Sequence, residues 1–279
     1  MRLDSHQHFW DYTSPPTDYV WMTDECAALR RDFGPPQLAP LLAGLGFTGC
    51  IAVQARELPQ ETDYLLGLAA LHPIIRGVVG WLDLLDPGVE RDLIRATANP
   101  KLRGLRMLIH DRPDLGFANS PAHCRGVGLL KKYGLTYDLL LKPPHLRPAT
   151  ALVDALPGQP FVVDHLAKPA IAEHLFSPWR EDLAELARRP NVFCKLSGLV
   201  TLVDWTTWQP DQLLPYLDIA LELFGPQRLM IGSDWPVCTC AATYPATMQV
   251  VIDWTARLSP AEREAILGGT CAQFYGIKS

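Results

Sequence analysis

The sequence alternates short apolar runs with longer helical segments, and this alternation repeats eight times along the chain. The runs at 51–53 and 139–141 are almost wholly aliphatic, which is typical of a parallel sheet buried on both faces. After a short first strand that ends on His6 and His8, the predicted strands are 48–54, 75–82, 102–109, 135–141, 161–165, 192–196 and 229–232. The predicted helices are 36–44, 60–71, 87–98, 121–133, 146–156, 178–188 and 212–224, with two more near 245–257 and 260–274.

Eight strand–helix units in 279 residues, with no break in composition, predict one fold class. This is an α/β fold, a (β/α)8 TIM barrel with a long first strand-to-helix loop and an extra C-terminal helix, forming a single domain over residues 1–279. The alternative is an open doubly wound sheet. That fold predicts a glycine-rich phosphate loop after the first strand, where this chain has His6-Gln7-His8 instead.

The segment 9–35 is a long connection with many large apolar side chains. Loops of this length in compact domains are usually functional. The segment is therefore predicted to be a lid or binding loop, or else a plug over one end of the core. Its large side chains are Phe9, Trp10, Tyr12, Tyr19, Trp21 and Met22.

Net charge argues against several classes of partner, and cysteine content argues against a disulfide-stabilised fold. The net charge is −5 and no run of Lys or Arg occurs, which argues against nucleic acid and anionic membranes. The sequence shows no signal segment and no apolar run of membrane-spanning length. Seven scattered cysteines do not suggest a disulfide framework. We expect a cytoplasmic enzyme that acts on a small molecule as a monomer or small homo-oligomer.

Chemically active side chains gather where the predicted strands end. Residues two apart on a strand share a face, so His6 and His8 point the same way and could hold a metal ion or polarise a carbonyl. Catalytic groups of a (β/α)8 barrel lie at the C-terminal strand ends, and this accumulation indicates an enzyme. The other groups at or near these ends are Gln54, Arg56, Trp81, Asp83, Arg103, Arg106, His110, Asp111, Asp138, Lys142, Asp164, His165, Lys168, Lys195, Ser197, Ser233, Asp234 and Trp235.

Strand parity ranks some of these groups. Arg103 and Arg106 have opposite parity, and Arg106 is preferred as the one facing the barrel axis. The same argument predicts His165 facing inward, with Asp164 on the other side as a support. The alternative for three charged groups is a rim salt bridge, and His110 is left open. The three are Asp83, Lys142 and Lys195, while His72, His123, His145 and His174 are predicted surface residues.

Several motifs together are similar to those of the amidohydrolase superfamily, and within it to the lactonase branch. The resemblance covers the whole chain and is specific only as a combination. The motifs are Asp4-Ser5-His6-Gln7-His8-Phe9-Trp10, Val53-Gln54-Ala55, Arg103-Gly104-Leu105-Arg106, Val163-Asp164-His165-Leu166-Ala167-Lys168-Pro169, Lys195-Leu196-Ser197-Gly198 and Gly232-Ser233-Asp234-Trp235-Pro236.

The resemblance implies hydrolysis of a sugar-acid lactone such as L-fucono-1,5-lactone, with Asp234 as the base that activates water. His6, His8 and His165 would polarise the lactone carbonyl, or with Asp234 would hold one Zn²⁺. Strand four offers arginines and strand five Asp138, so a binuclear centre is not expected. By resemblance, several such lactonases need no metal, and no organic cofactor is expected. The predicted substrate-binding residues are Gln54, Trp81, Arg106, Asp138, Lys142, Lys195 and Trp235.

Three alternatives stay open. A dicarboxylate lactone of the pyrone or muconate type would call for more arginines than the predicted rim offers. A zinc-dependent non-oxidative decarboxylase of the same superfamily uses a similar set of histidines and aspartate. A barrel that binds a ligand without turning it over is the third.

Overall fold

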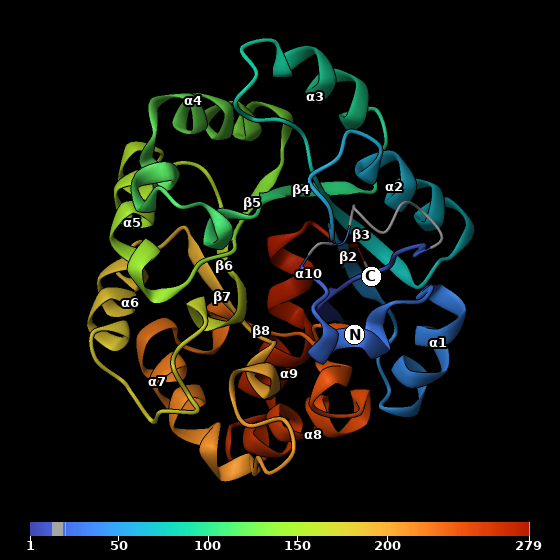
Figure 1. Ribbon diagram of the computed structural model, residues 1–279, viewed down its shortest axis with the longest axis vertical. Coiled ribbons are helices and arrows are strands. Elements are labelled where there is room, and N and C mark those ends of the chain that lie inside the picture. Colours follow the sequence, from blue (N-terminus) through green and yellow to red (C-terminus); the bar gives the residue numbers. More distant parts are fainter. Residues whose placement is uncertain (13–18, 20, 279) are drawn as a thin grey trace.

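The computed structural model describes residues 1–12, 19 and 21–278, and its centre is a ring of eight parallel strands (Figure 1). Each strand pairs with the next one in the chain. At the C-terminal ends of β1 and β8, the His8 N–H donates to Trp235 O (2.7 Å) and the Asp234 N–H donates to His6 O (2.8 Å), which closes the ring. The strands are β1 (Asp4–Gln7), β2 (Cys50–Val53), β3 (Ile75–Gly80), β4 (Leu102–Met107), β5 (Thr136–Leu139), β6 (Phe161–Val163), β7 (Val192–Leu196) and β8 (Leu229–Ile231).

The helices surround this ring, except for one near its centre (Figure 1). Apolar side chains between helices and strands form the larger core. The helices are α1 (Pro35–Gly44), α2 (Glu61–Leu71), α3 (Val89–Thr97), α4 (Pro121–Leu130), α5 (Leu146–Ala155), α6 (Trp179–Ala187), α7 (Leu214–Phe224), α8 (Tyr244–Trp254), α9 (Pro260–Glu264) and α10 (Thr270–Phe274). The (β/α)8 barrel predicted from the alternation is confirmed.

The element bounds differ from the prediction in two ways. Most strands are shorter at their C-terminal ends than predicted, because the backbone turns out of the ladder earlier; β6, for example, ends at Val163 rather than residue 165. The predicted helix 260–274 is interrupted by a π-helical stretch over Ala265–Gly269, and α10 follows it.

The last helix closes the N-terminal end of the barrel. Phe274 and Tyr275 pack against inward-facing strand residues, among them Val53 of β2 and Val162 of β6. The Leu3 N–H donates to Leu267 O (3.0 Å), which ties this segment to the start of β1. The opposite, C-terminal end of the barrel carries the polar residues.

The described part of the first loop is both a plug and a wall. Trp10, Tyr19 and Met22 are buried, and Trp10 packs edge-on to Phe33 at 5.4 Å between ring centroids. Trp21 lines the cavity described below. Residues 13–18 and 20 lie outside the described part of the chain.

Two histidines assigned to the surface are buried instead. His123 is on the buried face of α4, where its Nε2 is 2.7 Å from the Tyr137 hydroxyl and its Nδ1 is 2.7 Å from Ala118 O. His145 is also buried. Both lie on helical segments whose inner face could not be identified from their local sequence. Among the described residues, no helix is both long and apolar enough to cross a membrane.

Candidate active site

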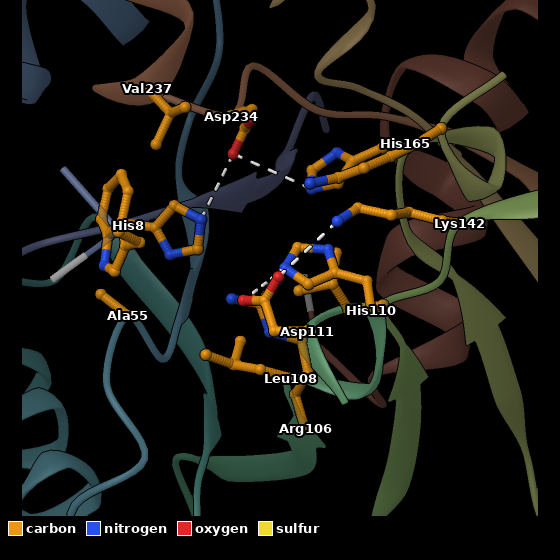
Figure 2. A pocket seen from close by; sticks show the side chains of 13 residues that line it. His8, Ala55, Arg106, Leu108, His110, Asp111, Lys142, His165, Asp234 and Val237 are labelled. Carbon is orange, nitrogen blue, oxygen red and sulfur yellow. Dashed lines mark ion pairs between the residues drawn. The ribbon is translucent and has the colours of Figure 1, made fainter. Parts of the chain in front are cut away.

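A cavity of about 280 Å³ opens at the C-terminal end of the barrel (Figure 2). It is near the lower end of the range for ligand sites, which suits one small molecule. Its walls come from segments that follow β1, β2, β4, β5, β6 and β8, as expected for this barrel. The lining residues are His8, Trp21, Ala55, Arg106, Leu108, His110, Asp111, Leu140, Lys142, His165, Lys168, Asp234 and Val237.

Three histidines surround one carboxylate at this cavity. The Asp234 Oδ1 atom is 3.3 Å from His8 Nε2, 3.8 Å from His6 Nε2 and 4.0 Å from His165 Nε2. His6 and His8 share a face, as their spacing predicts, with their Nε2 atoms 3.2 Å apart. Figure 2 shows Asp234 between His8 and His165. The predicted catalytic set is therefore brought together.

Second partners orient two of the imidazoles. His8 Nδ1 is 2.8 Å from the carbonyl oxygen of Val53, so Nδ1 is the donor of this hydrogen bond. His165 Nδ1 is 2.8 Å from Ser197 Oγ. Both contacts direct Nε2 toward Asp234. Burial, opposed by Asp234 and Asp164, lowers the pKa of His165 to about 4, so this ring is neutral at pH 7.

Asp234 is fixed by its own backbone. It has a φ of 58°, and its N–H donates to His6 O. The preceding residue is held by Asp4, whose Oδ1 accepts from the Ser233 N–H (2.9 Å) and the His6 N–H (3.1 Å). Burial alone would raise the pKa of Asp234, but His165, His8 and His6 together hold it well below its usual range. Asp234 is thus a carboxylate at neutral pH.

The prediction that Asp164 and His165 face opposite sides is wrong. Asp164 points into the barrel, where its Oδ2 accepts from Arg106 Nη1 (2.9 Å) and its Oδ1 lies 3.0 Å from Lys195 Nζ. His165 also faces the site. Strand parity does not apply here, because β6 ends at Val163 and positive φ values from His165 onward turn the chain.

Beneath the cavity lies a buried charge cluster of Asp138, Asp164, Lys195 and Arg106. Lys195 Nζ is 2.5 Å from Asp138 Oδ2 and 3.1 Å from His6 Nδ1. Burial would raise the pKa of Asp164, but Lys195, His6 and Arg106 hold it well below its usual range. Burial raises the pKa of Asp138 to about 6 against the pull of Lys195. Two cations and two carboxylates therefore balance one another around His6.

The predicted substrate-binding residues divide into two groups. Arg106 and Lys142 line the cavity, and Arg106, rather than Arg103, faces the barrel axis. Lys142 Nζ lies 3.7 Å from Asp111 Oδ1. The others are buried and do not line the cavity, so we place them behind its wall; these are Gln54, Trp81, Asp138, Lys195 and Trp235.

Several lining residues were not among the predicted site residues. His110, Asp111 and Lys168 were visible at strand ends without a reason to choose them. Burial lowers the pKa of His110 to about 4. Trp21 and Val237 carry no sequence signal beyond their place in the first and last loops.

The donor set fits a single divalent ion. A tetrahedral zinc at 2.0–2.1 Å from its ligands separates the ligand atoms by about 3.3 Å. The Nε2 atoms of His6 and His8 and the Oδ1 of Asp234 are separated by 3.2, 3.3 and 3.8 Å. Arg106 Nη1, 3.3 Å from His6 Nε2, adds positive charge that opposes a cation there.

Comparisons with known proteins find similarity over nearly the whole chain. A family model described as "Amidohydrolase" matches residues 3–277. The chain is 41% identical to an L-fucono-1,5-lactonase of Burkholderia multivorans, over 99% of this chain and 96% of the relative. It is 35% identical to an L-fucono-1,5-lactonase of Burkholderia ambifaria, with the same coverage. Crystal structures of an amidohydrolase from Burkholderia multivorans, one with bound HEPES and one with bound Zn, match with a TM-score of 0.95, at 40% and 41% identity, over 100% of each chain.

Proposed function

The chain belongs to the amidohydrolase family, and from this premise we propose that it hydrolyses a sugar-acid lactone, with L-fucono-1,5-lactone as the expected substrate. The observation that carries the proposal is the Asp234 carboxylate, ringed by three imidazoles at the wall of a small cavity. The names of two full-length relatives support the choice of lactone.

Asp234 acts as the base. It removes a proton from a water molecule as the oxygen of that water attacks the lactone carbonyl. The Ser197 hydroxyl donates a hydrogen bond to His165 Nδ1, so the proton of the neutral imidazole is on Nε2. This Nε2–H group stabilises the carbonyl oxygen as it becomes negative. A zinc ion held by His6, His8, His165 and Asp234 would supply the same polarisation as a Lewis acid. The buried charge cluster keeps His6 in place beside Asp234.

The cavity has two chemically different sides. Ala55 and Val237 lie on the side of His8, and Lys142 lies on the side of His165 (Figure 2). A 6-deoxy sugar lactone combines a methyl group with several hydroxyls. Its methyl would contact the apolar side, and its hydroxyls would bind Lys142 and Asp111.

Proton release in weak buffer over a panel of aldonolactones tests the proposal, with metal-stripped and zinc-loaded protein measured in parallel. We expect rapid acid release from L-fucono-1,5-lactone and release about tenfold slower from its 6-hydroxy counterpart, because the hydroxyl would lose water against an apolar wall. Activity of the stripped protein would assign polarisation to the protein's own donors. No acid release from any aldonolactone, together with release of CO2 from an aromatic acid or turnover of a pyrone dicarboxylate, would contradict the proposal.

The pH profile should report the buried histidines. An imidazole of ordinary pKa gains its proton near pH 6.5. His165 has its pKa lowered, so it stays neutral until about pH 4, and the Asp234 carboxylate persists below that. Protonated His165 would pair with Asp234 and weaken the base. We therefore expect protonation of His165 to lower kcat/KM near pH 4, measured with circular dichroism at each pH to exclude unfolding. An acid limb near pH 6.5 instead would show that His165 does not set the profile.

A further inference from the structure

Lys168 lines the cavity, and the reaction outlined above does not use it. We propose that Lys168 is a further catalytic residue, whose ammonium group gives a proton to the ring oxygen of the lactone as the carbon–oxygen bond breaks. The proposal rests on the proposed function and adds to it the group that completes ring opening.

The backbone around Lys168 is built in a rarely used conformation. His165, Leu166, Ala167 and Lys168 all have φ between 52° and 58°, although none is glycine. L-residues adopt this left-handed region at an energetic cost, and such strain is concentrated at functional sites. The fully buried Leu166 holds the turn, because its carbonyl accepts from Trp179 Nε1–H at 2.6 Å.

This turn explains why Lys168 and His165 share the cavity. The Lys168 N–H donates to His165 O (2.8 Å), a bond between residues three apart. In a turn of this kind, side chains three apart lie on the same side. The unusual backbone thus brings both His165 and Lys168 to the lining of the same cavity.

The Lys168 ammonium is available to a ligand. In the part of the chain that the structure describes, no hydrogen bond or ion pair of its side chain is present, whereas Arg106 is bound to Asp164 and Lys142 lies near Asp111. A lysine of this kind is suited to give up a proton.

The proton balance closes with Lys168 included. Asp234 takes one proton from water, and the hydroxide oxygen bonds to the carbonyl carbon. When the bond from that carbon to the ring oxygen breaks, the electron pair goes to the ring oxygen, which takes a proton from Lys168. The new carboxylic acid returns a proton to the Lys168 amine. Asp234 releases its proton to solvent, so one lactone and one water give one hydroxy-carboxylate and one proton.

Sulfur in place of the ring oxygen separates this role from a structural one. A thiolate leaves without a proton, whereas an alkoxide needs one. For Lys168→Met we expect kcat to fall about 100-fold or more on L-fucono-1,5-lactone, with KM within about threefold of wild type, and less than about fivefold on the 1,5-thiolactone. Lys142→Met is the matched control, since it removes another cavity ammonium and should leave the ratio of the two rates at its wild-type value.

The outcomes are distinct. Wild-type protein that is inactive on every aldonolactone would remove the proposed function. Active wild-type protein, with a Lys168→Met variant whose losses are equal on both lactones or confined to KM, would overturn the role of Lys168 alone. Lys168→Arg gives a second reading on the oxygen lactone: it keeps the charge but is a far weaker acid, so kcat should stay below about a tenth of wild type. Full recovery by arginine would also overturn proton donation.

Discussion

Replacing Asp234 with asparagine is expected to lower kcat/KM on the lactone by about 10³-fold, within the range that a general base contributes. Asparagine has nearly the same shape and keeps the backbone bond to His6 O, but its amide cannot take a proton from water. The three imidazoles around the side chain would then face a neutral group. Initial rates by proton release, with circular dichroism to show that the fold is kept, measure the effect.

Asp111→Asn provides the control for this experiment. Asp111 is also a carboxylate on the cavity wall, but it lies beside His110 and Lys142, away from the histidines that surround Asp234. We expect its replacement to change KM more than kcat. An Asp234→Asn variant with near-normal turnover would rule out Asp234 as the base.

Replacing Lys195 with methionine should destabilise the protein by about 3–5 kcal/mol, because removing one partner leaves buried charges without compensation. Lys195 is fully buried, and its ammonium lies within 3.0 Å of both Asp138 and Asp164. Methionine fills a similar volume, so the loss would reflect charge rather than a cavity. Urea unfolding followed by circular dichroism measures the change in the free energy of unfolding.

The double variant Lys195→Met with Asp138→Asn serves as the comparison. It removes one cation and one carboxylate together, which restores the charge balance of the buried cluster. We expect it to be more stable than the single variant by about 1–2 kcal/mol, since only hydrogen bonds would then be missing. An unchanged urea midpoint in Lys195→Met would mean that water reaches this cluster.

The strand periodicity identified the parts of the site that lie on strands. A period of two correctly predicted that His6 and His8 share a face and that Arg103 and Arg106 do not, and the preferred one, Arg106, is the one that turns toward the axis. Asp234 was found because parallel strands in a barrel all end on one rim. These inferences need only local geometry and the fold class.

The same reasoning failed where the chain leaves the ladder. The side chains of Asp164 and His165 both point inward because of a left-handed turn. The four residues of this turn include no glycine, so the sequence does not predict it. The burial of Asp138 and Lys195 was also not predictable from the sequence. Both occupy strand positions that are typical of the exposed rim, but the C-terminal segment covers them from the other end of the barrel. Their partners are set by tertiary packing, which one strand at a time does not reveal.

The catalytic site depends on the last segment of the chain to be synthesised. Tyr275 donates its hydroxyl proton to Asp138 Oδ2 (2.8 Å) and packs near Lys195, so the charge cluster under His6 is sealed by a residue far along the chain. A chain released from the ribosome before residue 270 would contain His6, His8, His165 and Asp234, yet water would enter the barrel from below. Premature termination before α10 would therefore yield a protein that contains every catalytic residue but lacks the segment that seals the charge cluster beneath them.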